Sequence, residues 1–316
     1  MNHLLHTSVV SFLLLGLLPP TYAGHPIVIQ GNNKLARLNQ DGDIEWEMKW
    51  GGIHDIHVLP TGNIMVQERN RKIVEIDPQT RKVVWSYDCT TQNANQGKRI
   101  EAHAFQPLAN GHIMIAESGV GRIIEIDRNG TIHHQIKLKI RNPHPHRDTR
   151  LARKLPNGNY LVCHEGDGAV REYEGKTGKV VWEYDIPLFG KQPRGGHGPE
   201  AFGNQVFGAV RLANGNTLIA TGNGHSVLEV NPAKKIVWKI EQKDLPGITL
   251  AWVTTLEVLP NGNYVIGNCH AGPKNPLVIE IEPKTKKVVW TLDKHNVFGN
   301  SVPNTQVLVT KGATNR

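Results

Sequence analysis

Leu155-Pro156-Asn157-Gly158-Asn159 stands between two apolar runs, and close variants of this turn occur five times in the chain. The turn glycines are Gly62, Gly111, Gly158, Gly215 and Gly262, spaced 49, 47, 57 and 47 residues apart. Each turn is followed by a segment that ends in Val-Val-Trp or a relative, as at Val180-Val181-Trp182. A period of about 50 residues built only of short strand-like segments is typical of a β-propeller with one blade per repeat.

Each repeat is interpreted as four strands. The first two flank the Asn-Gly turn, which predicts a two-residue hairpin whose central residues both have positive φ. The third strand alternates apolar and polar residues, as in Ile73-Val74-Glu75-Ile76-Asp77, and the fourth carries the tryptophan. We expect the tryptophans to pack between adjacent blades rather than to bind a ligand. In the second complete repeat, His133 is expected at the tryptophan position.

Five complete repeats begin near residues 53, 100, 143, 202 and 250. Residues 25–50 supply three strands without a first one, and residues 304–310 supply a first strand alone. Together these fragments predict a sixth blade that joins both ends of the chain and leaves no exposed sheet edge. The predicted fold is therefore all-β: a six-bladed β-propeller of four-stranded blades, closed by pairing of the N- and C-terminal segments.

Residues 4–18 are mostly apolar and lack charged side chains, and Pro19-Pro20 and Thr21-Tyr22-Ala23 follow them. This pattern predicts a signal peptide at residues 1–23, with an uncleaved membrane anchor as the alternative. Residues 24–316 then form a single propeller domain. We expect this domain to be periplasmic or secreted, soluble after signal cleavage and monomeric.

The 316-residue chain has 36 Lys and Arg against 28 Asp and Glu, a net charge of +8. No nucleic-acid-binding motif accompanies this charge, so we expect no nucleic-acid partner. An anionic ligand or an acidic surface is the alternative partner, and a role in solubility alone remains open. The three cysteines, Cys89, Cys163 and Cys269, are expected to be buried thiols because their number and spacing give no disulfide framework.

In a propeller the first strand of each blade lines the central channel, so its start and the end of the second strand share one face. Histidine, arginine and acidic residues gather in these two windows of the sequence. Counting eight residues back from the turn glycines, and adding the terminal strand, gives one ring of channel positions: His54, His103, Arg150, Phe207, Thr254 and Asn304.

We assign catalytic candidates to His54, His103 and Arg150, since imidazole can act as base or nucleophile and guanidinium can clamp an oxyanion. The ligand-binding candidates lie in the same windows: His57, Glu101, His146, Arg147, His164, His197, His270 and Asn304. The alternative is a polar channel that holds only water. No short-spaced metal-ligand signature is present, so no metal ligand is assigned, although several His with Glu101 or Glu165 could hold a divalent ion.

The phrase Gly175-Lys176-Thr177-Gly178-Lys179-Val180-Val181-Trp182 resembles the repeat of pyrroloquinoline-quinone-type propellers over nearly all of residues 25–310. The segment Gly52-Ile53-His54-Asp55-Ile56-His57 with its following Asn-Gly-type turn also resembles bacterial arylsulfotransferases, which are six-bladed exported propellers. That resemblance implies His54 and His103 as transient sulfate carriers and Arg150 and Asn304 as oxyanion partners.

These observations predict binding of a small anionic or sugar-like ligand at a His/Arg-rich channel mouth. Group transfer of the arylsulfotransferase kind or lyase chemistry could occur there. The alternatives are a non-catalytic scaffold for protein interactions and, through the first resemblance, a quinone-dependent redox protein. No cofactor is assigned, and a divalent metal is left open.

Overall fold

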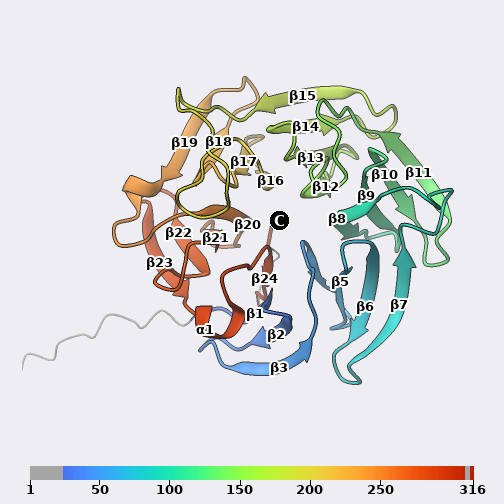
Figure 1. Cartoon of the computed structure of the whole chain (residues 1–316), viewed down its shortest axis with the longest axis horizontal. Helices are drawn as coiled ribbons and strands as arrows, with labels where there is room; N and C mark the ends of the chain where they lie inside the picture. Colours follow the sequence, from blue (N-terminus) through green and yellow to red (C-terminus); the bar gives the residue numbers. More distant parts are fainter. Residues whose placement is uncertain (1–23, 310–313) are drawn as a thin grey trace, which may run out of the picture.

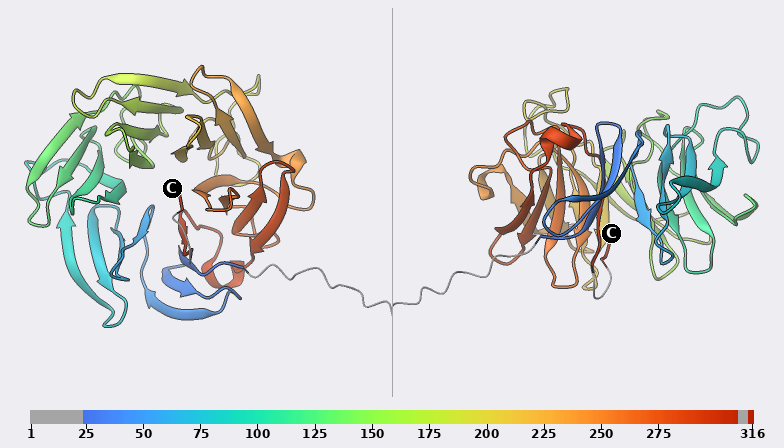
Figure 2. Two further views of the ribbon diagram at one scale, coloured as in Figure 1. Left: turned by 180° about the vertical axis from the view of Figure 1, so that it is seen from behind. Right: turned by 90° about the horizontal axis from the view of Figure 1, so that it is seen from below.

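The computed structural model describes residues 24–309 and 314–316, and the predicted signal peptide lies outside these residues. The described chain forms six four-stranded antiparallel sheets. They are arranged as blades around a central axis, and the side view shows a flat disc (Figures 1 and 2). This confirms the predicted six-bladed β-propeller.

Blades 1 to 3 follow one another in the sequence, and each runs outward from the channel. Blade 1 contains β4 Ile56–Val58, β5 Ile64–Glu68, β6 Lys72–Asp77 and β7 Lys82–Asp88. Blade 2 contains β8 Glu101–Pro107, β9 Ile113–Ser118, β10 Arg122–Ile126 and β11 Ile132–Lys137. Blade 3 contains β12 Ala152–Lys154, β13 Tyr160–His164, β14 Ala169–Tyr173 and β15 Val180–Asp185.

The remaining blades complete the ring. Blade 4 contains β16 Gly208–Arg211, β17 Thr217–Ala220, β18 Ser226–Val230 and β19 Ile236–Glu241. Blade 5 contains β20 Trp252–Val258, β21 Tyr264–Cys269, β22 Val278–Glu282 and β23 Lys287–Leu292. The closing blade contains β24 Thr305–Val307, β1 Ile27–Gly31, β2 Lys34–Leu38 and β3 Ile44–Lys49.

The first and the last strand of the described chain pair in the closing blade. Strand β24 pairs with β1 in antiparallel register, with Val307 opposite Ile27 and Thr305 opposite Ile29. The sheet order β24-β1-β2-β3 places the C-terminal strand innermost. The predicted closure by both chain ends is therefore confirmed.

The five repeated turns have a different geometry from the predicted two-residue hairpin. In blade 1 the Gly62 amide donates to the Leu59 carbonyl at 2.9 Å and the Leu59 amide donates to the Asn63 carbonyl at 2.8 Å. Only the glycine has positive φ, 88° at Gly62, so this is a three-residue loop. The turns with Ala109 and Ala213 in place of Pro60 have the same two hydrogen bonds, so the shared cause is the glycine, the one residue that a three-residue loop needs at positive φ.

The hydrophobic core lies between neighbouring blades. One cluster, for example, joins Met65 and Tyr87 of blade 1 to Phe105 and Ile124 of blade 2. A blade in a propeller cannot bury its two faces alone, so each blade depends on its neighbours. Cys89, Cys163 and Cys269 are buried free thiols, as expected.

The tryptophan of each outer strand joins its blade to the next one. The indole N–H of Trp46 donates to the Pro78 carbonyl at 2.8 Å, and that of Trp85 donates to the Arg128 carbonyl at 2.7 Å. Trp182 and Trp238 make the same contact with Pro232 and Pro283. The tryptophans therefore pack between blades, although they are half-buried rather than buried.

His134, and not His133, occupies the tryptophan position of blade 2. The strand register pairs Glu125 with His134, as it pairs Glu75 with Trp85 in blade 1. The Nε2 atom of His134 lies 2.6 Å from the carbonyl oxygen of Gly175 in blade 3. Matching Thr131-Ile132-His133 to Val-Val-Trp displaced the assignment by one residue, because Glu125 and His134 are nine residues apart whereas Glu75 and Trp85 are ten apart.

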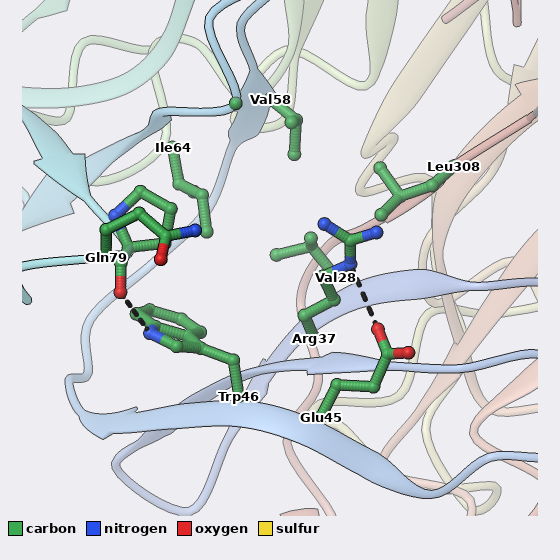
Figure 3. Close-up of a pocket in the computed structure, with 10 residues that line it drawn as sticks. Val28, Arg37, Glu45, Trp46, Val58, Ile64, Gln79 and Leu308 are labelled. Carbon is green, nitrogen blue, oxygen red and sulfur yellow. Dashed lines mark hydrogen bonds and ion pairs between the residues drawn. The ribbon is translucent and has the colours of Figure 1, made fainter.

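A second repeated contact involves the glutamate of the third strand. Glu75, for example, accepts hydrogen bonds from Asn63 of its own blade and from Arg128 of the next blade. In the closing blade Arg37 stands at this position and pairs with Glu45 at 3.2 Å. Arg37 and Trp46 line a cavity of about 250 Å³ between the closing blade and blade 1 (Figure 3).

Helical structure in the described residues is confined to the short α1, His295–Phe298, and the 3-10 turn Gln242–Asp244. Within the described part of the chain, no helix has the length and apolar character needed to cross a membrane. The described residues Thr314–Arg316 lie at the centre of the ring, where the C label stands in Figure 1.

Candidate functional site

A small cavity opens where the innermost strands begin, on the face opposite the repeated turns. We call it the mouth cavity. Its volume is about 110 Å³. Its lining comes from five of the six blades, either from their strands or from the segments that precede these strands, and blade 2 contributes none. The lining residues are His54, His146, Arg150, His197, Phe207, Trp252, Thr254, Cys269, His270, Ser301 and Pro303.

His54 precedes β4, where two backbone contacts fix its peptide. Its amide donates to the Gln67 side chain at 3.1 Å, and its carbonyl accepts from the Asn304 side chain at 3.1 Å. Its ring centroid lies 4.5 Å from that of His103 and 6.2 Å from that of His146. Its Nδ1 atom is buried and has no hydrogen-bond partner.

Glu101 and His103 are two residues apart on β8, and Glu101 also contacts His146. Oε2 of Glu101 lies 2.9 Å from Nε2 of His103 and 2.7 Å from Nδ1 of His146. The pairing of β8 with β9 shifts register between Glu101 and Ala104. Such a bulge re-aims the side chains of a strand, here at the channel end of β8.

Arg150 connects the histidine group to a buried carboxylate. Its Nη1 atom lies 3.1 Å from Nδ1 of His103, and its Nε atom donates to Glu165. Arg150 and Glu165 are both buried, with 6% and 3% of their surface exposed. The pair is therefore close to neutral as a unit, with one edge of the guanidinium facing the cavity.

The opposite wall of the cavity is aromatic. The ring of His197 lies 4.9 Å from the ring of Trp252 and 5.2 Å from that of His270. His197 belongs to the long connection between blades 3 and 4 and is exposed. Trp252, only 5% exposed, begins β20.

Burial controls the protonation of the imidazoles. Burial, with the nearby His103 and Arg150, holds the pKa of His54 well below its usual value. Burial also lowers the pKa of His103 to about 4, although the hydrogen bond with Glu101 opposes this shift. Hydrogen bonds from His103 and His146 hold the pKa of the Glu101 carboxyl well below its usual range. At pH 7, His54 and His103 are therefore neutral and Glu101 is ionised.

Six candidate residues lie outside the lining of the mouth cavity: Glu101 and His103, which contact His146 and His54 of the lining, and four others. His57 hydrogen-bonds the Phe105 carbonyl at 2.7 Å and lines a separate cavity on the turn face. His164 is enclosed between the Asp148 carbonyl and the Tyr173 hydroxyl. Asn304 is buried beneath His54, and Arg147 is exposed. His57, His164 and Asn304 thus have protein partners away from the lining of the mouth cavity, and their ligand-binding roles stay predictions.

The ring of six channel positions is assembled as a connected group. His54, Arg150, Phe207 and Thr254 line the cavity, while His103 and Asn304 lie directly behind His54. Sequence reasoning left out two members of the site as site residues. Trp252 could have been found from the sequence, because it stands at the start of a first strand. Glu165 could also have been found, because it follows a second strand. Its ion pair with Arg150 could not, because nothing in the sequence links the two residues.

One set of side chains in the described residues has the donor atoms of a metal site. A ligand atom from each of Glu101, His103 and His146 lies within 4.8 Å of the other two. The sequence does contain a short-spaced pair here, because residues 101 and 103 point to the same side of a strand. The third ligand comes from the next blade, which the sequence could not indicate.

The family comparison matches almost the whole propeller. The family model described as outer membrane protein assembly factor BamB matches residues 31–292. This confirms the resemblance to pyrroloquinoline-quinone-type repeats, while the resemblance to arylsulfotransferases stays a prediction. No curated protein sequence matches the chain.

Solved structures share the fold at low sequence identity. A protein of unknown function from Bacteroides caccae is 22% identical, with a TM-score of 0.72, covering 89% of this chain and 98% of its own. A streptogramin B lyase is 15% identical, with a TM-score of 0.56, covering 89% and 87%. Virginiamycin B lyase from Staphylococcus aureus is 14% identical, with a TM-score of 0.52, covering 81% and 76%. At these identities the likeness concerns the fold alone.

Proposed function

The chain belongs to the family of the outer membrane protein assembly factor BamB, and within this propeller family we propose that it binds a small ligand with an anionic group in the mouth cavity. The observation that carries the proposal is the convergence of four imidazoles and one guanidinium, from separate segments, on one cavity. Such convergent polar groups in a concave site are the usual mark of a ligand pocket.

The size of the cavity limits what can enter it. About 110 Å³ accommodates one small group of a ligand, such as a sulfate or a carboxylate, rather than a whole sugar. The rest of the ligand lies over the aromatic wall formed by His197 and Trp252. An aromatic or sugar ring suits that wall, because flat apolar faces stack well on indole.

The chemistry that we propose at this site is group transfer or elimination. The imidazole of His54 is the group placed to accept a proton or a transferred group. Arg150 is the group placed to bind the oxygen atoms of the anion, because guanidinium presents paired N–H donors. His146 and His270 flank the same opening and can donate further hydrogen bonds.

Binding of 4-nitrophenyl sulfate, measured by calorimetry, tests the proposal. The double variant Arg150→Gln/Glu165→Gln removes the guanidinium without leaving a buried carboxylate unpaired. We expect affinity to fall about tenfold or more in this variant and in His54→Ala. His112→Ala, on the opposite face beside His133, is the matched control and keeps the wild-type affinity.

Equal binding by wild type and both site variants would reject the proposal. Turnover tests group transfer. Release of nitrophenol that requires an added phenol, with the sulfuryl group passing from one phenol oxygen to the other, indicates transfer, whereas release without an acceptor is hydrolysis, in which water takes the sulfuryl group. Elimination needs a different substrate, because an aryl sulfate has no hydrogen on a saturated carbon next to the leaving group.

A second candidate function is an assembly scaffold, as the family description suggests. Three valines on outer strands are not buried between blades. Val84, Val181 and Val237 are 54%, 52% and 51% exposed. Each valine lies on the outer strand of a different blade, so a protein partner that uses more than one of them would contact the outer rim of the ring. Under this function, variants of the mouth cavity are silent and Val84→Asp abolishes association.

A further inference from the structure

We propose that Glu101, His103 and His146 bind one divalent transition-metal ion of the Zn²⁺ class at the floor of the mouth cavity. The donor set is one carboxylate oxygen and two imidazole nitrogens, which suits Zn²⁺ and similar ions. The inference deepens the proposed function and rests on it only for the role that the ion would have. Binding of the ion itself is a separate claim.

The geometry needs little movement to accept an ion. Glu101 Oε2 lies 2.9 Å from His103 Nε2 and 2.7 Å from His146 Nδ1. Tetrahedral zinc with ligand bonds of about 2.0–2.1 Å separates its donor atoms by about 3.3 Å. These two contacts must therefore lengthen by about 0.5 Å, and the two imidazole nitrogens, which lie within 4.8 Å of each other, must reach the same separation of about 3.3 Å, which rotation of the partly exposed His146 can supply.

A metal-binding histidine usually donates a hydrogen bond from its other ring nitrogen, and His103 has an acceptor placed for this bond. Its Nδ1 atom lies 3.2 Å from the Thr149 carbonyl oxygen. When Nε2 binds a metal ion, the neutral ring carries its one proton on Nδ1 in place of Nε2, and Nδ1–H can then donate to this carbonyl and fix the ring. His103 is fully buried, so its ring is already held in place.

Metal binding would also change the partner of Arg150. A guanidinium only donates, so the 3.1 Å contact between its Nη1 atom and His103 Nδ1 requires Nδ1 to accept. Once Nδ1 carries the proton, this contact is lost and an Arg150 N–H becomes available to a ligand in the cavity.

The charges around Glu101 and the exposure of His146 both favour a metal ion that helps to bind an anionic ligand. Glu165 neutralises Arg150, and the exposed Arg99 lies 4.0 Å from the second carboxylate oxygen of Glu101. A divalent ion would add two positive charges to this inner group and favour an anionic ligand. The side chain of His146 is 41% exposed and lines the cavity, so the fourth position of the ion faces the ligand.

The test uses the full protein after treatment with a chelator and dialysis. Zn²⁺ alone is titrated by calorimetry, and bound zinc is counted by elemental analysis. We expect one ion per chain and a loss of affinity of about tenfold or more in His146→Ala and in Glu101→Gln. His112→Ala is the control that keeps full affinity. Because His146 is partly exposed, His146→Ala tests the site even if Glu101→Gln fails to fold.

Chelator-treated wild-type protein that binds no added zinc, or variants that bind zinc as tightly as wild type, would overturn the inference. The two proposals can fail separately. Chelated protein that binds 4-nitrophenyl sulfate but no zinc leaves the proposed function standing, whereas zinc binding without sulfate-ester binding rejects only that function. Zinc-loaded protein should bind 4-nitrophenyl sulfate more tightly than chelated protein, and unchanged affinity contradicts the role of the ion.

Discussion

At the scale of single residues, the segment that contains His54, Asp55 and His57 shows how neighbouring side chains take different roles. Successive side chains of an extended segment point to opposite sides. His54 therefore faces the mouth cavity, while Asp55 and His57 share the other side. Arg153 binds the Asp55 carboxylate at 2.7 and 2.9 Å, which keeps the pKa of Asp55 well below its usual range.

A second buried acid, Glu257 on β20, has the opposite shift. It is 1% exposed and accepts hydrogen bonds from the Val307 amide at 3.0 and 3.2 Å. Burial raises the pKa of Glu257 to about 7, although Arg316 and the Val307 amide oppose this shift. Glu257 therefore holds a proton in the folded protein at a pH at which the unfolded chain has lost it.

This shift predicts the pH dependence of stability. Between about pH 4.5 and 7 the folded state binds more protons than the unfolded state, so this group lowers the free energy of unfolding as pH rises, by up to about 3 kcal/mol. Glu257→Gln cannot ionise and lacks this contribution. Urea unfolding at pH 5 and pH 8 should show a difference between variant and wild type that grows with pH. Parallel stabilities at both pH values would contradict the assignment.

At the scale of elements, the outer strands form a repeated inter-blade bond. The tryptophan N–H of one blade reaches a carbonyl in the turn before the outer strand of the next blade, as between Trp85 and Arg128. Blade 2 makes the equivalent contact through His134 and Gly175. Different residues can therefore make the same bond, because the acceptor is a backbone carbonyl that every blade possesses.

Trp85→Phe tests this bond, since it removes the N–H and keeps an aromatic ring. We expect a loss of about 1 kcal/mol in the free energy of unfolding, the usual contribution of one hydrogen bond. Val83→Ala, at a 45% exposed position on the same strand, is the control and should change stability much less. Equal stability of Trp85→Phe and wild type, measured by urea unfolding, would show that the contact is not stabilising.

At the scale of the whole molecule, the closing blade makes the ring one cooperative unit. Core clusters lie between blades, and the cluster of the closing blade joins Val307 of β24 to Leu259 and Val265 of blade 5. Loss of β24 would expose both this cluster and the edge of β1. A local defect there should therefore weaken the entire ring.

Val307→Asp places a carboxylate at a position that is 1% exposed. We expect a loss of about 3 kcal/mol or more, because an unpaired buried charge is costly. Calorimetry should show a single transition at a lower temperature than in wild type. The same substitution at the exposed Val84 is the control. Two separate transitions in Val307→Asp would mean that the blades unfold independently.

The sequence by itself determined the number of blades, the four-stranded pattern and the closure by both chain ends. These follow from local periodicity, which fixes strand length and the spacing of turns. It also indicated which face gathers the histidines, since the start of a first strand and the end of a second strand share one face. The predicted turn geometry and the assignment of His133 were wrong, because the Asn-Gly pattern occurs in three-residue loops as well as in two-residue ones, and because Glu125 and His134 are one residue closer in sequence than Glu75 and Trp85.

Only the tertiary structure decided which candidates share a site. It placed His54, His146, Arg150, His197 and His270 on one cavity and assigned His57 and His164 to other surroundings. It also brought Glu101 within hydrogen-bond distance of His146, 45 residues further along the chain. The physical reason is that these contacts cross from one blade to the next. The distances between residues of different blades depend on how the sheets pack against one another. The face on which a side chain lies depends on the strand register, because a shift of one residue moves it to the opposite face.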